Sequence, residues 1–159
     1  MQEAIKLAVI TEKNAMNFYL IGARQLNDPG AKRLFEQLAK EERAHAHYFF
    51  GAYSGDDLGS FEEFMDSPVQ YESVWFASLS KALEPDFSER TALEIAMEKE
   101  KTLEAALREK AATVTDARGR DIFEYNAKET HNHYLTIEAE YARLMAMVDE
   151  SDMDTYVRE

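Results

Sequence analysis

The segment Leu38–Phe50, LAKEERAHAHYFF, decides how this sequence is interpreted. Leu38 and Phe49 lie on one face of the helix that the segment predicts, and Glu42 and His45 fall on that same face. A carboxylate that is removed from water loses several kcal/mol of hydration unless a cation or a proton compensates for it. The segment therefore predicts a polar site inside a helical fold.

The composition of the 159 residues favours a single all-α domain, because 45% are apolar and only six are Gly and three Pro. The formal net charge of −13 argues against binding to nucleic acid or to an anionic membrane surface, since both would be repelled. The same charge attracts cations. Metal ions are therefore better candidate partners than nucleic acids or membranes.

The sequence contains no Cys, which excludes disulfides, cysteine-ligated iron–sulfur clusters and thiol catalysis and suits a reducing cytoplasm. The first 22 residues carry charges at Glu3, Lys6, Glu12 and Lys13 and have no uninterrupted apolar run. They resemble neither a signal peptide nor a membrane span. We expect a soluble, unprocessed, cytoplasmic protein.

Apolar periodicity predicts four long helices. One turn signal separates the two helices of each half: NDPG at residues 27–30 in the first half and a polar turn near Asp116 in the second. Ser88 is a candidate N-cap for the third helix. A mixed segment at residues 60–86, with short helical pieces around FEEFMDS and VQYESVWFASLSKAL, is expected to cross over outside the core. The expected ranges are 3–26, 29–53, 88–114 and 115–148, with a domain over 1–150 and an acidic tail or short terminal helix over 151–159.

The two halves of the chain resemble each other when the sequence is shifted by 88 residues. Twelve identical pairs then align without a gap, among them Glu12 with Glu100 and His45 with His133. Shared composition alone would give roughly three. The repeat predicts two similar αα-hairpins joined by a long crossover, which is a four-helix bundle with one long connection.

Both first helices of these hairpins place a Glu in an apolar stripe, Glu12 in one and Glu100 in the other. Both second helices place a His in theirs, His45 and His133. A dinuclear metal site in a bundle core uses one Glu from each of two helices and a Glu-x-x-His from each of the other two. The i to i+3 spacing of Glu42 and His45 directs their oxygen and nitrogen donors toward one centre. The pattern therefore predicts a metal site.

Four segments resemble the ferritin-like superfamily and, more closely, the di-iron domain of rubrerythrin, in an order that matches over about residues 3–148. They are EKNAMNFY from Glu12, FEQLAKEERAH from Phe35, EKTLEAAL from Glu100 and FEYNAKETHNH from Phe123. The resemblance implies two iron ions, with Mn or Zn as possible substitutes. It also implies Glu12 and His45 as terminal ligands of one ion, Glu100 and His133 of the other, and Glu42 as the bridge.

The sequence departs from the family pattern at two places. Thr130 stands three residues before His133, where the family has a second bridging Glu, and the nearest carboxylate is Glu129. Glu129 is retained as a candidate ligand because i to i+4 also shares a helix face. Leu103 takes the place of a second Glu in the third long helix, which rubrerythrins use in redox-linked ligand switching.

These features lead to three functional hypotheses. The first is a di-iron oxidoreductase that reduces peroxide or O2, oxidises Fe(II), receives electrons from a separate donor and forms a homodimer. The second is iron storage in a cage, and the third is a structural or interaction protein with a degenerate single-metal site. The tyrosines near the site, Tyr19, Tyr48 and Tyr134, are interpreted as core aromatics rather than redox groups.

Overall fold

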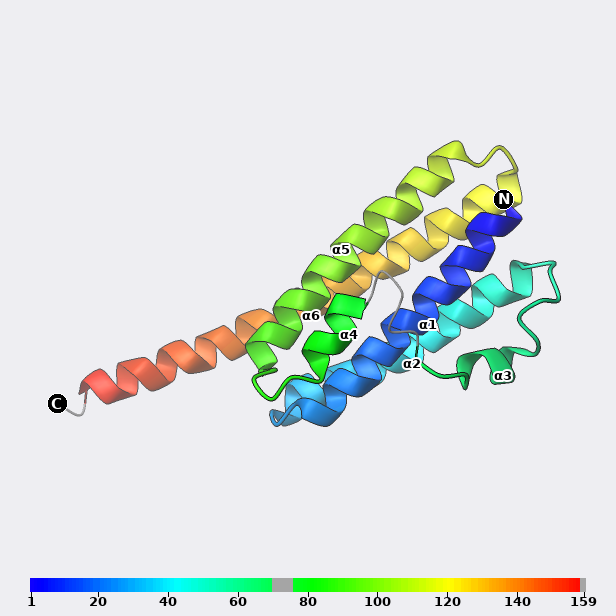
Figure 1. The fold of residues 1–159 in the computed structure, drawn as a ribbon. Helices are drawn as coiled ribbons and strands as arrows, with labels where there is room; N and C mark the ends of the chain where they lie inside the picture. The colour runs from blue at the N-terminus through cyan, green and yellow to red at the C-terminus, as the bar shows by residue number, and fades with distance from the viewer. Residues whose placement is uncertain (70–75, 158–159) are drawn as a thin grey trace.

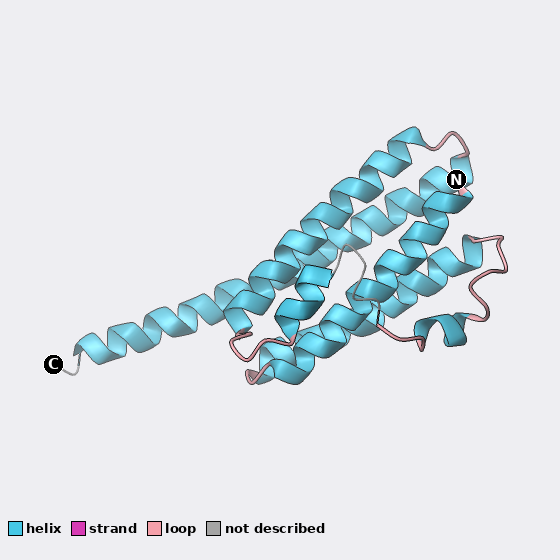
Figure 2. Cartoon of the chain, in the orientation of Figure 1, coloured by secondary structure: helices cyan, strands magenta, loops and turns pink. Residues whose placement is uncertain are grey.

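The computed structural model describes residues 1–69 and 76–157. In that part of the chain all regular structure is helical and no strand is present, so the predicted all-α class is confirmed. The described residues form four long helices and two short ones (Figures 1 and 2). The helices are α1 (Gln2–Gln25), α2 (Pro29–Ala52), α3 (Phe61–Met65), α4 (Phe76–Ala82), α5 (Glu89–Thr113) and α6 (Ala117–Val157).

Each hairpin is closed by a side-chain cap at its turn. Asp28 Oδ2 accepts a hydrogen bond from the backbone N–H of Ala31 at 2.9 Å and begins α2, with Pro29 as the first helical residue. Asp116 Oδ2 accepts one from Gly119 at 2.8 Å where α6 begins. The two long hairpins, α1 with α2 and α5 with α6, are therefore defined locally before they pack on each other (Figure 1).

The crossover packs against the first hairpin, with α4 against α1 and α3 against α2. The apolar side chains Phe64 and Met65 of α3 and Leu79 and Ala82 of α4 are all buried. Residues 12–19 of α1 are buried without interruption, so α1 is covered both by the bundle and by the crossover. The crossover thus contributes to the core rather than lying outside it. Part of the piece predicted around VQYESVWFASLSKAL falls outside the described residues.

The helix α6 is the longest element, with 41 residues, and its C-terminal part extends past the other helices (Figure 1). It continues to Val157, through most of the acidic segment 151–159, for which the sequence predicted either a loose tail or a short terminal helix. The domain boundary at residue 150 remains a prediction. No helix in the described part of the chain combines the length and the apolar character that crossing a bilayer would require.

Candidate metal centre

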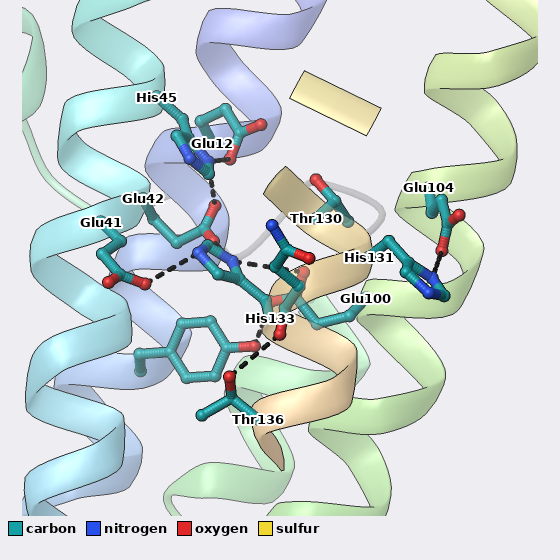
Figure 3. Close-up of polar contacts among 12 residues, drawn as sticks. Glu12, Glu41, Glu42, His45, Glu100, Glu104, Thr130, His131, His133 and Thr136 are labelled. Carbon is teal, nitrogen blue, oxygen red and sulfur yellow. Dashed lines mark hydrogen bonds and ion pairs between the residues drawn. The ribbon is translucent and has the colours of Figure 1, made fainter. Parts of the chain in front are cut away.

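Five of the six predicted ligands converge in the middle of the bundle, and they come from all four long helices (Figure 3). Their side chains are almost inaccessible to solvent. The exposed fractions of the whole residues are 1% for Glu12, 1% for Glu42, 7% for His45, 1% for Glu100 and 5% for His133. The sixth, Glu129, does not join them.

Glu42 lies between the two imidazoles. Its Oε1 is 2.7 Å from Nδ1 of His133, and its Oε2 is 3.9 Å from Nδ1 of His45. Carboxylates from the two other helices approach the same nitrogens, with Glu12 Oε2 4.0 Å from His45 and Glu100 Oε2 3.7 Å from His133. The imidazole rings stack at 5.0 Å between centroids and 14° between planes. Both Nδ1 atoms therefore face the carboxylates.

Several buried polar atoms of this cluster lack hydrogen-bond partners among the described residues. Seven buried polar atoms have no hydrogen-bond partner among the described residues: both oxygens of Glu12, both of Glu42, Oε2 of Glu100, and Nδ1 of His45 and of His133. The 2.7 Å approach between Glu42 and His133 lacks hydrogen-bond geometry, so it does not satisfy either atom. Buried polar groups in folded proteins are nearly always paired, and a group left unpaired costs about 1–3 kcal/mol.

A divalent transition metal fits this donor set. Carboxylate oxygens and imidazole nitrogens are ligands for Fe, Mn and Zn, and donor atoms of Glu42, His45 and His133 lie within 4.8 Å of one another. The cation would supply the positive charge that three buried carboxylates lack. The seven unpaired atoms are thus explained if the site holds metal.

Burial and neighbouring charges together shift the pKa values of the groups in the cluster. Burial, and then the charge of Glu42, raise the pKa of Glu12 well above its usual range. Burial, and then the charge of Glu100, do the same to the pKa of Glu42. Burial and the neighbouring His133 lower the pKa of His45 to about 4. Burial opposes protonation of His133, but the carboxylates around it raise its pKa.

Tyr19 is the one predicted core aromatic that the structure places in contact with the cluster. It is fully buried, and its hydroxyl donates a hydrogen bond to Oε1 of Glu100. Burial, and then the charge of Glu100, raise the pKa of Tyr19, so the phenol keeps the proton it donates. The expectation for Tyr48 was wrong, because that residue is 46% exposed and its ring lies against Tyr125 of α6, and Tyr134 is half-buried.

Thr130 and Glu129 explain why the second hairpin contributes fewer donors. Thr130 is 1% exposed, and its hydroxyl donates to the backbone carbonyl of Asn126 at 2.8 Å. Glu129 is half-buried on α6 and has no hydrogen bond or ion pair to any residue in the described part of the chain. Consecutive residues differ by about 100° around a helix axis. Glu129 therefore lies at the edge of the buried face on which Thr130 is centred.

Two acidic residues near the cluster were not singled out from the sequence. Glu104 follows Leu103 on α5, but it bonds Nδ1 of His131 at 2.9 Å and is turned away from the centre (Figure 3). Glu41 Oε2 lies 2.9 Å from Nε2 of His133 (Figure 3). The only sequence signal for Glu41 was its identity with Glu129 in the repeat.

The fold and the site together define a helical bundle of the ferritin-like class with a carboxylate and histidine cluster at its centre. A family model described as Rubrerythrin matches residues 3–141. The chain therefore belongs to the rubrerythrin family. Searches of the curated proteins and of the solved structures found no match.

Proposed function

We propose that this chain is a rubrerythrin-type non-haem iron oxidoreductase that oxidises Fe(II) while it reduces peroxide or O2. The observation that carries the proposal is the set of seven unpaired polar atoms from four helices at one buried place. Each H2O2 would take up two electrons and two protons and yield two waters, the electrons coming from two ferrous ions. Bound iron would supply this redox chemistry, as it does in two-metal sites.

The protein's own residues hold and shield the site. Glu12, Glu42 and Glu100 would provide oxygen donors, and His45 and His133 would provide Nδ1 donors. The Tyr19 hydroxyl fixes one oxygen of Glu100 and leaves the other free toward the cluster. Since each of the five residues is at most 7% exposed, water has little access to the site.

The proposal extends to the partners and the setting. Because the 159 residues contain no Cys, the electrons that return the iron to its ferrous form come from a donor outside this sequence. We place the reaction in the cytoplasm and the chain in a homodimer. Size-exclusion chromatography with light scattering measures the oligomer directly.

The experiment is anaerobic loading of the metal-free protein with Fe(II), followed by peroxide, with the ferric absorbance recorded in time. We expect oxidation faster than that of free iron in the same buffer. A Glu42→Leu variant should lose this acceleration, whereas Glu36→Leu, which removes an exposed carboxylate from the same helix, should keep it. Oxidation by the wild-type protein at the rate of free iron would refute the proposal.

A single-metal binding protein is the second candidate, and Thr130 favours it. The hydroxyl of Thr130, engaged with Asn126, does not supply the missing bridge. Elemental analysis of protein from iron-grown cells decides between the two: two Fe per chain supports the oxidoreductase, and one Zn supports the binding protein.

A further inference from the structure

Glu41 is the only carboxylate among the described residues that contacts an imidazole of the cluster from outside. It precedes Glu42 on α2, and its side chain is 42% exposed, whereas that of His133 is 6% exposed. Its Oε2 lies 2.9 Å from Nε2 of His133, while Nδ1 of the same ring faces Glu42. The ring of His133 is thus held at one edge and presented to the cluster at the other (Figure 3).

The contact between Glu41 and Nε2 suits the imidazole tautomer that a metal ion on Nδ1 requires. With a metal ion on Nδ1, the remaining proton of a neutral imidazole would lie on Nε2, where the ionised carboxylate of Glu41, 2.9 Å away, can only accept it. A proton on Nε2 leaves the lone pair of a neutral imidazole on Nδ1, on the side of the unpaired oxygens. A carboxylate on the far nitrogen of a metal-bound histidine fixes ring orientation and raises ligand basicity.

The arrangement is found on one side of the site only. His45 has no outer carboxylate within the described part of the chain, because its contacts are Nδ1 with Glu12 and Glu42 and the stacked ring of His133. His133 stands on the helix where Thr130 replaces a carboxylate, so it carries a larger share of the binding there. Holding its ring also limits rotation of the His45 ring that stacks on it.

We propose that Glu41 is a positioning residue that holds His133 with Nδ1 directed at the metal. The inference rests on the proposed function, since it assumes that the cluster binds a metal ion. It predicts that Glu41 raises metal affinity through His133, without being a ligand itself.

The test measures Zn²⁺ affinity near neutral pH by competition with a chromophoric chelator, so no turnover is needed. Glu41→Leu should weaken binding by about 10–100-fold, the usual effect of losing such an outer partner. Glu41→Gln keeps an acceptor oxygen at the same position and should restore most of the affinity. Glu36→Leu removes the same charge from an exposed position of α2 and should bind as the wild type does.

A double-mutant cycle separates positioning from simple charge attraction. In a His133→Ala background, Glu41→Leu should have no further effect, because the ring on which Glu41 acts is absent. A penalty that persists in that background would assign Glu41 a general electrostatic role and overturn the proposal. Equal affinities of Glu41→Leu and wild type would overturn it too, and leave the proposed function standing. Absence of Zn²⁺ and Fe(II) binding by the wild type would overturn both.

Discussion

Replacing Glu42 by Leu should stabilise the metal-free protein and abolish its stabilisation by metal. The side chain is 1% exposed, and neither of its oxygens has a hydrogen-bond partner in the described residues. Leucine has a comparable length and no polar atom to leave unpaired. An unpaired buried polar group costs about 1–3 kcal/mol, and losing the approach to His133 offsets part of the gain.

The expected net gain is about 1–2 kcal/mol, which for a chain of this size raises Tm by about 2–8 °C. The wild type should respond in the opposite way, through metal. A ligand at 100 times its Kd adds about 2.7 kcal/mol to the free energy of unfolding, or about 5–11 °C in Tm. Glu42→Leu should show little of this response, because its substitution removes the donor between the two imidazoles.

Thermal unfolding followed by circular dichroism tests both expectations, first with a chelator and then with excess Zn²⁺ or anaerobic Fe(II). Glu36→Leu is the matched control and should leave both Tm values unchanged. If metal-free Glu42→Leu melts below the metal-free wild type, the cluster is not the source of instability that its unpaired atoms indicate, and the reasoning fails.

Three further predictions concern single residues. Thr130→Glu restores Glu-x-x-His before His133 and should raise the metal content per chain, measured by elemental analysis; an unchanged content would show that the family position no longer faces the site. Gly22→Ala should lower Tm despite the better helix propensity of Ala, because its Cβ would lie 2.7 Å from the Phe35 ring, an overpacking that costs about 1–3 kcal/mol. Gly51→Ala, with no atom within 4 Å, should leave Tm unchanged or raise it. Burial lowers the pKa of Lys13, so the unfolded state binds more protons than the folded state at alkaline pH. The free energy of unfolding of the wild type should therefore rise relative to that of Lys13→Met as the pH approaches the pKa of free lysine. A difference between the two proteins that stays constant with pH in denaturant titrations would contradict this.

The helix boundaries could be predicted because local signals set them. The ranges 3–26 and 29–53 differ by one residue at most from α1 and α2, since Asp28 and Pro29 determine the turn through short-range geometry. The burial of the crossover could not be read in this way. Lys13 is fully buried because Ser67 and the carbonyl of Pro68 accept its hydrogen bonds, and these contacts join positions more than 50 residues apart.

The candidate site, too, could be predicted where it depends on one helix and not where it depends on contacts between helices. Periodicity and the repeat located Glu12, Glu42, His45, Glu100 and His133, because a buried stripe is a property of one helix. Their role as metal ligands remains a prediction. The choice between Glu129 and Glu41 depends on how α2 and α6 approach each other, which no single-helix pattern contains. Both acids look like solvated neighbours of the stripe, and only Glu41 contacts an imidazole.

The asymmetry between the halves has a structural consequence. In the repeat, Thr130 corresponds to Glu42 and Leu107 to Tyr19, so the second hairpin lacks a carboxylate and a phenolic hydroxyl that the first has. Its two remaining donors are both held by side chains of the first hairpin, Glu100 by the Tyr19 hydroxyl and His133 by Glu41. The first hairpin therefore carries three of the five candidate ligand residues and contacts the other two. Substitutions in α1 and α2 should consequently disturb metal binding on both sides of the centre, whereas substitutions of neighbouring residues in α5 and α6 should disturb only their own side.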